Sequence, residues 1–139
     1  MIAIIADGVD VASGPIPIAL AHAGFDPHEI RTTDEAARCL ETHGPKDCVL
    51  VVQVGSLFAR AAEWLALLRE HGAVAAVIVA RGEAAADARA AARAPHRILL
   101  EDPFDAAAIA AAAIRVSASA RGRLHRVSPD VSRGSRYAS

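Results

Sequence analysis

Short runs of apolar, often β-branched residues alternate along this chain with longer stretches in which apolar side chains recur at helical spacing. The short runs predict strands at residues 2–6, 28–32, 48–54, 74–80 and 97–100. The stretches between them predict helices at residues 15–23, 34–43, 57–71, 83–93 and 106–120. Thr33 and Asp105 are the expected caps of the second and the last helix. The pattern is therefore a succession of strand–helix units.

Two of the predicted strands, 48–54 and 74–80, are apolar on both faces. Such strands lie inside parallel sheets that are covered by helices on both sides. Crossovers of this length are right-handed, so the units predict a three-layer α/β sandwich of the flavodoxin-like (βα)5 class, with strand order 2-1-3-4-5. We expect one domain over residues 1–120 and an arginine-rich extension over residues 121–139.

The net charge of −1 conceals a division between the two parts of the chain. Residues 1–105 carry nine basic and fifteen acidic side chains, whereas residues 106–139 carry six arginines and a single acid, Asp130. The apolar fraction of 53% excludes disorder for the bulk of the chain. A basic end of this kind indicates an anionic partner.

The cysteines and the apolar runs indicate the compartment. Cys39 and Cys48 lack CxxC spacing, so we expect buried free thiols rather than a disulfide or a metal site. The first residues carry no basic segment and meet Asp7, which is unlike a signal peptide. The longest apolar runs, 73–80 and 106–114, are far shorter than the ~20 residues of a membrane span. We therefore expect a cytoplasmic protein, and the bias toward Ala and Arg is typical of a GC-rich bacterial genome.

The residues that end the predicted strands carry a resemblance to a known family. They include Asp7-Gly8, Gln53-Val54-Gly55, Ala80-Arg81-Gly82 and, after the last strand, Asp102-Pro103-Phe104. With this order and length of elements, residues 1 to about 120 resemble the response-regulator receiver domain, in which the last turn reads Lys-Pro-Phe. The resemblance implies a receiver fold with its site at the carboxyl ends of the strands.

The departures from that family argue against phosphotransfer. A phosphorylatable receiver needs an aspartate after the third strand, where this chain has Gln53 or Val54. It also needs a hydroxyl after the fourth strand and a lysine after the fifth, where Ala80 and Asp102 stand. Of the acidic pair that holds Mg²⁺, only Asp7 is present. We therefore expect a pseudo-receiver without catalytic residues.

Other cofactor and enzyme signatures are missing as well. Asp7 and Asp102 could form a weak metal site across this edge, but two solvated or helix-capping carboxylates are the favoured interpretation, because no third ligand is placed beside them. The six histidines are scattered, and no GxGxxG motif or P-loop lysine occurs. Trp64 lies on an apolar helical stripe, which favours the core or an interface. The sequence thus predicts no metal, no cofactor and no enzyme.

The arginine-rich end is the strongest remaining signal. Guanidinium groups bind phosphate with two hydrogen bonds and also pair with the O6/N7 edge of guanine. Arg123 and Arg126 lie shortly before Asp130-Val131-Ser132-Arg133-Gly134. With these residues the segment resembles the arginine-rich segments that bind cyclic di-GMP, including the paired arginines and Asp-x-Ser motif of PilZ-type receptors. It resembles more closely the extension of alphaproteobacterial receiver-like effectors. The resemblance implies cyclic di-GMP as ligand and a protein target such as the flagellar motor or a histidine kinase. The expected ligand-binding residues are Arg121, Arg123, Arg126, Asp130, Ser132, Arg133 and Arg136.

Three alternatives stay open at this point. The basic segment could be a solvated tail of an arginine-biased protein. Alternatively, it could contact nucleic acid weakly, although no recognition helix or aromatic platform supports this interpretation. The chain could also be a protein-interaction or dimerisation module that uses its Ala-rich last two helices.

Overall fold

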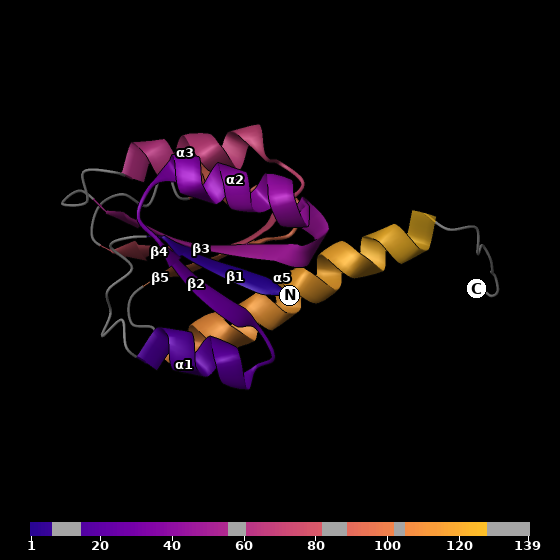
Figure 1. Cartoon of the computed structure of the whole chain (residues 1–139), viewed down its shortest axis with the longest axis horizontal. Coiled ribbons are helices and arrows are strands. Elements are labelled where there is room, and N and C mark those ends of the chain that lie inside the picture. The colour runs from indigo at the N-terminus through magenta and orange to yellow at the C-terminus, as the bar shows by residue number, and fades with distance from the viewer. Residues whose placement is uncertain (7–14, 56–60, 82–88, 102–104, 128–139) are drawn as a thin grey trace.

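Five parallel strands form a single sheet in the computed structural model of the chain (Figure 1). The structure describes residues 1–6, 15–55, 61–81, 89–101 and 105–127, and for residues 53–55, 61, 81 and 121–127 it describes the backbone alone. The strands are β1 (Ile2–Ala6), β2 (Asp26–Ile30), β3 (Cys48–Gly55), β4 (Ala75–Arg81) and β5 (Arg97–Glu101). Their order, β2-β1-β3-β4-β5, confirms the predicted topology.

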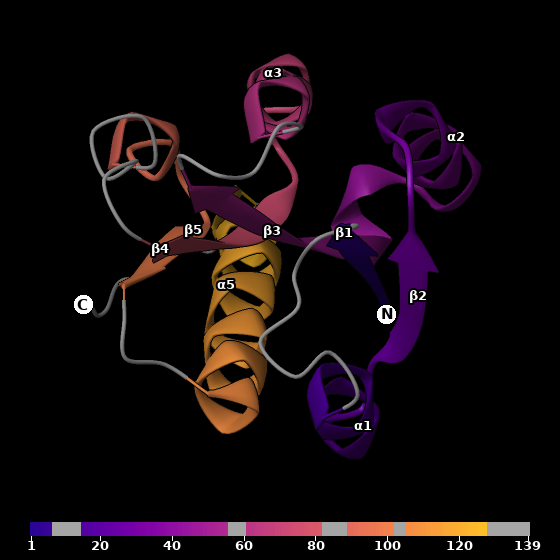
Figure 2. The ribbon, with the colours of Figure 1, turned by 90° about the vertical axis from the view of Figure 1, so that its left-hand side faces the viewer.

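Helices cover both faces of this sheet (Figure 2). On one face lie α1 (Pro15–His22) and α5 (Ala106–Val127), and on the other lie α2 (Thr33–His43) and α3 (Ala61–Glu70). A short 3-10 helix, η1 (Pro45–Asp47), leads into β3. The three-layer α/β sandwich expected from the sequence is therefore confirmed. None of the helices in the described part of the chain is long and apolar enough to cross a membrane.

The core forms around β3 and β4, the two strands predicted to be apolar on both faces. Residues 49–52 and 76–79 are fully buried. On the α5 side they are covered by Ile109 and Ala113. Most other residues in the first half of α5 are alanines, and their small side chains allow the helix to lie close to the sheet. Trp64 of α3 is fully buried on the other side. Trp64 is therefore a core residue, one of the two roles that the sequence allowed it.

Pairing with β1 corrects the position of β2. The sequence placed this strand at 28–32, but the parallel register matches Ile2 with Asp26 and Ala6 with Ile30. The Asp26 N–H also donates to the Met1 carbonyl at 2.9 Å. Pro27 is accommodated because an edge strand leaves one row of N–H groups unpaired in any case. Long-range pairing, which the local pattern does not encode, thus shifts the strand by two residues.

The helix caps agree with the sequence to within a residue. Thr32, rather than Thr33, caps α2: its hydroxyl oxygen accepts from the Glu35 N–H at 3.1 Å. The Thr32 hydroxyl also donates to the Glu35 carboxylate at 3.2 Å, which makes this a capping-box pair. Asp105 caps α5 as expected, through a 2.8 Å hydrogen bond from the Ala108 N–H.

Helix α5 continues seven residues past its predicted end. The sequence ended this helix near Ala120, before Gly122, but the helix extends to Val127. A single glycine costs a helix only about 1 kcal/mol, and arginines in the last turns compensate the negative end of the helix dipole. The last turns of α5 project beyond the sheet (Figure 1). The predicted boundary after Ala120 thus falls inside a helix, and the division into residues 1–120 and 121–139 stays a prediction.

Two other predicted helices are described only in part. The helix expected at 57–71 is α3, Ala61–Glu70, and residues 56–60 lie outside the described residues. Of the helix expected at 83–93, residues 89–91 are helical, and residues 82–88 lie outside the described part of the chain.

Gly44 ends α2 in a backbone conformation with positive φ, which other residues adopt only with strain. Its φ and ψ are 85° and 147°, and its N–H donates to the Leu40 carbonyl at 2.8 Å. We expect Gly44→Ala to lower the free energy of unfolding by about 1–3 kcal/mol in urea titrations. A methyl group there meets no atom within 4 Å, so the loss comes from backbone strain alone.

Gly72→Ala is the matched control. Gly72 has no positive φ, and a methyl group there also meets nothing within 4 Å. It should leave stability unchanged or raise it slightly. Equal losses in the two variants would contradict the backbone argument.

Candidate functional site

The carboxyl edge of the sheet is the usual place for chemistry in a fold of this class. There β1 ends at Ala6, and β4 brings Ala80 beside Val54 of β3. Ala6 and Ala80 are only 2% and 4% exposed. Both side chains are methyl groups, so these two positions offer no hydrogen bond and no charge to a ligand.

Gln53 lies at the end of β3, paired with Val79 of β4. At this strand end a phosphorylatable receiver domain would need an aspartate. A carboxamide is neutral and cannot form an acyl phosphate. Glu101, at the end of β5, is half exposed and lies 3.5 Å from the Arg89 guanidinium, an exposed ion pair of small energetic weight. The ends of β3 and β4 therefore offer neither a carboxylate nor a hydroxyl group.

Asp7 and Asp102, for which the sequence favours two solvated or helix-capping carboxylates over a weak metal site, lie outside the described residues. Within the described ranges, no three His, Cys, Asp or Glu side chains are grouped in a way that could hold a metal ion.

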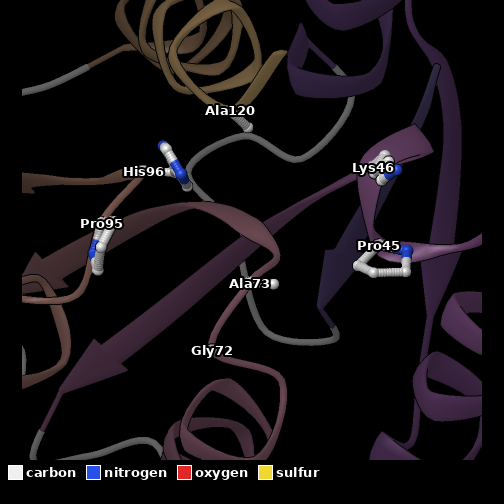
Figure 3. A pocket seen from close by; sticks show the side chains of 7 residues that line it. All are labelled: Pro45, Lys46, Gly72, Ala73, Pro95, His96 and Ala120. Atoms are coloured by element: carbon white, nitrogen blue, oxygen red, sulfur yellow. The ribbon is translucent and has the colours of Figure 1, made fainter. Parts of the chain in front are cut away.

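A pocket of about 330 Å³ opens at the opposite, amino edge of the sheet (Figure 3). It is lined by residues that precede β3, β4 and β5, together with one residue of α5: Pro45, Lys46, Gly72, Ala73, Pro95, His96 and Ala120. Figure 3 shows Lys46 and His96 on opposite sides, with Ala120 between them. Its volume is at the lower end of the range of small-molecule sites, ~300–1,000 Å³. The pocket therefore combines an apolar wall with two polar groups.

His96 joins this edge to α5. The His96 Nδ1 and the Ser119 hydroxyl are hydrogen-bonded at 3.1 Å, and the His96 carbonyl accepts from the Ala76 N–H at 3.0 Å. Its φ of 63° is in the left-handed region, which a residue other than glycine occupies only where its surroundings hold it there. The imidazole thus has a defined position on the pocket wall.

Arg97 stabilises the turn between α3 and β4. Its Nε donates to the Val74 carbonyl at 3.1 Å, and its Nη2 donates to the carbonyls of Leu68 and His71 at 3.0 and 3.2 Å. Leu68 belongs to the last turn of α3, whose carbonyls carry the negative end of the helix dipole. Burial lowers the pKa of the Arg97 guanidinium, which nevertheless stays cationic at neutral pH. Arg97 therefore positions Gly72 and Ala73 at the pocket.

Only some of the residues predicted to bind ligand belong to the described part of the chain. Arg121, Arg123 and Arg126 lie in the last turns of α5, and Arg121 directly follows Ala120 of the pocket wall. Positions 123 and 126 are three apart in the helix and share a face. The other predicted residues, Asp130, Ser132, Arg133 and Arg136, lie outside the described residues.

Lys46 and His96 were not predicted from the sequence, because no motif surrounds them. The available signal is their position: each lies just before a predicted strand, and the amino ends of parallel strands meet at one edge.

Comparison with known proteins identifies the fold. No protein-family model and no curated protein matches the chain. Among solved structures, the receiver domain of NtrX from Brucella abortus is similar, with a TM-score of 0.64, 18% identity, and coverage of 86% of this chain and 99% of that domain. A response regulator receiver domain from Clostridium thermocellum gives a TM-score of 0.64, 16% identity, and coverage of 89% and 98%.

A longer NtrX structure from Brucella abortus matches 96% of this chain, with a TM-score of 0.69 and 16% identity. This chain spans only 31% of that protein's length. Taken together, the neighbours show that the chain has the fold of response regulator receiver domains, as the sequence resemblance implied.

The role of Arg97 leads to a stability prediction. Arg97→Met removes a guanidinium that donates to the carbonyls of Leu68 and His71 at the end of α3 and of Val74 before β4. We expect the free energy of unfolding to fall by about 2–3 kcal/mol in chemical denaturation, because charged hydrogen bonds to partly buried carbonyls are lost.

Arg89→Met serves as its control, because it removes an arginine that is paired with Glu101 at the surface. It should change stability by less than about 0.5 kcal/mol. A loss from Arg97→Met no larger than that of Arg89→Met would show that the guanidinium does not hold this turn.

Proposed function

We propose that the chain is a non-catalytic signalling module that works without phosphorylation and binds cyclic di-GMP where α5 leaves the fold. The observation that carries the proposal is the pocket beside Ala120, whose wall is followed directly by Arg121. In this proposal the apolar cavity and Lys46 act together with the arginines at positions 121, 123 and 126, which follow Ala120 in α5. In this proposal the receiver fold is a rigid support for that edge.

The chemistry of cyclic di-GMP supports this choice of ligand. The molecule presents two phosphates and two guanine bases, and arginine binds both kinds of group with paired hydrogen bonds. Arg123 and Arg126 share a helical face and are suited to the phosphates, with Lys46 adding positive charge from the pocket. The apolar wall of Pro45, Pro95 and Ala120 would cover the face of one guanine.

The remaining predicted residues would act together with these. Asp130, Ser132, Arg133 and Arg136 follow α5 in the sequence and would complete the contacts once the ligand is bound. A segment that orders on binding loses conformational entropy, so we expect moderate and salt-sensitive affinity. The ordered segment would offer a new surface to a protein target, with the flagellar motor and a histidine kinase as candidates, in the cytoplasm.

A second function is favoured by the apolar stripe of α5. Ile109, Ala113 and Val116 are buried, and the same spacing continues through Ala120 to Leu124 and Val127. The last two positions lie in the turns that project beyond the sheet (Figure 1). An apolar stripe beyond the core is typical of a helix that packs against another protein. A protein-interaction or dimerisation module is therefore the alternative, and weak binding of nucleic acid is tested alongside it below.

The absence of phosphotransfer can be tested directly. With Gln53 and Ala80 at the strand ends, incubation with acetyl phosphate and Mg²⁺ should leave the intact mass of the protein unchanged. A phosphorylatable receiver domain treated in parallel is the positive control. Gain of one phosphate by the parent protein would contradict the proposal, whichever residue carries it.

Ligand binding is tested by calorimetry at moderate salt with cyclic di-GMP, cyclic di-AMP, GTP and duplex DNA. Arg123→Lys and Arg126→Lys keep the charge but lose the paired hydrogen bonds, worth about 1–3 kcal/mol each, so affinity for cyclic di-GMP should fall about tenfold. The control Arg115→Lys changes an exposed arginine upstream on the same helix and should bind like the parent.

Three results would contradict specific recognition: no binding of cyclic di-GMP, equal binding of cyclic di-AMP, or lysine variants that bind as well as the parent. Preferential binding of DNA would favour the nucleic-acid alternative. Concentration-dependent self-association without ligand binding would favour the interaction module.

A further inference from the structure

The outer sides of α1 and α5 are uncharged although they face solvent. Residues Pro15–Ala21 of α1 and Ala106–Ile114 of α5 contain no ionisable side chain. Ile18 of α1 is 60% exposed and Ile114 of α5 is 49% exposed. A helix that is apolar on every side is typical of a buried position. Both helices therefore have the composition of buried helices but leave one side in water.

The opposite layer of the molecule has the usual pattern of surface helices. On α2 the exposed side includes Asp34, Arg38 and Glu41, and on α3 it includes Glu63 and Arg69. These helices bury an apolar side and present charges to water. The composition of the chain as a whole therefore does not account for the uncharged layer, because the other layer of the same chain is charged.

The exposed sides of α1 and α5 form one surface, which we call the α1–α5 face. The two helices pack against each other on the same side of the sheet (Figure 2). On α5 the exposed apolar positions recur at intervals of four, three and four residues, which places them on one side of the helix. They are Ala107, Ala111, Ile114 and Ala118. This side is opposite to the stripe that Ile109 buries against the sheet. Adjoining exposed apolar residues mark interaction sites on soluble proteins.

We propose that the α1–α5 face binds a second copy of this chain, with the two α5 helices packed against each other. A partner that placed a charge on this face would remove its water and offer it no counter-charge, which is costly. The partner surface must therefore be uncharged as well. Among the described helices, α1 and α5 alone combine an uncharged segment of this length with exposed apolar residues, so the same face of a second copy meets the requirement.

The charges at the two ends of α5 favour an antiparallel pair. Asp105 is exposed at the start of the helix, and the arginines at positions 121, 123 and 126 lie in its last turns. In an antiparallel pair centred between Ala111 and Ile114, Asp105 of each copy is level with residues 120 and 121 of the other. A parallel pair would instead bring the arginines of both copies together. The antiparallel pair also opposes the two helix dipoles.

Size and shape fit a two-fold pair of this kind. In the antiparallel arrangement Ile114 of each copy packs against Ala111 of the other, so a large side chain meets a small one twice. Residues 106–118 of α5 rise by ~20 Å, and α1 adds a second helix about 10 Å away. The α1–α5 face therefore covers on the order of 400 Å² per copy, about half of what each partner buries in a standard complex. The dimer is accordingly weak and reversible.

The inference is independent of the ligand proposed for the amino edge, and it uses a different side of α5 from the stripe that continues to Leu124. It is tested by sedimentation velocity of the full chain over about 5–500 µM, a range that covers weak association. The weight-average mass of the parent should rise with concentration from 14.4 kDa toward twice that value. A parent that stays monomeric over the whole range would overturn the proposal.

Two variants place a charge on the proposed interface. Ala111→Glu and Ile114→Glu should each lower the association constant at least about tenfold, because the added carboxylate finds no counter-charge there. The matched control Ala62→Glu adds the same charge to the exposed side of α3 and should associate like the parent. Thermal melting first establishes that every variant is folded. Equal association of Ala111→Glu and Ala62→Glu would overturn the proposal.

The alternative surface of α5 is tested by Leu124→Glu, which should leave this association unchanged. A loss of association in Leu124→Glu, with none in Ala111→Glu, would overturn the proposal and favour the last turns of the helix. Calorimetry with cyclic di-GMP on the same variants reports on the function proposed above, so failure of ligand binding is observed separately from failure of dimerisation.

The orientation is tested by crosslinking in a Cys39→Ala background, which removes the partly exposed native thiol. Ala107→Cys and Ala118→Cys are prepared as separate proteins, one of them tagged, then mixed and oxidised. The antiparallel pair predicts that the disulfide between positions 107 and 118 forms faster than either symmetric disulfide. Faster formation of the symmetric disulfides would overturn the antiparallel arrangement.

Discussion

Parallel pairing of β3 with β4 is the constraint on which the rest of the structure depends. Both strands are fully buried through their central residues, so both faces of the sheet must be covered by helices. Parallel strands joined by helices also send all carboxyl ends to one edge and all amino ends to the other. The positions of Ala80, Gln53, Lys46 and His96 follow from this single arrangement, before any local interaction is considered.

The two edges differ in chemistry. At the carboxyl edge, the described residues include two buried methyl groups and a carboxamide position, and the ion pair of Glu101 with Arg89 lies at the surface. The amino edge contains a pocket, a histidine held by Ser119, and a guanidinium that organises the end of α3. Helix α5 passes this edge and carries its arginines beyond it. The proposed function therefore uses the edge opposite the usual one.

The sequence predicted the sheet and its order because the buried strands are encoded locally by uninterrupted apolar runs. It misplaced β2 because the register depends on pairing with β1, and it ended α5 too early because one glycine was given more weight than the residues around Gly122. It expected two buried free thiols; Cys48 is buried, whereas Cys39 on the outer part of α2 is only partly buried. The pocket was missed because its residues come from four separate segments and meet only in the fold.

The most direct test of this account maps where the ligand acts on the folded protein. Backbone amide chemical shifts would be followed during titration of the ¹⁵N-labelled chain with cyclic di-GMP. The account predicts shifts at Lys46, Ala73, His96 and Ala120, at the amino edge, and unchanged amides at Ala6, Ala80 and Glu101, at the carboxyl edge. Shifts confined to the carboxyl edge, or no shifts at saturating ligand, would contradict it.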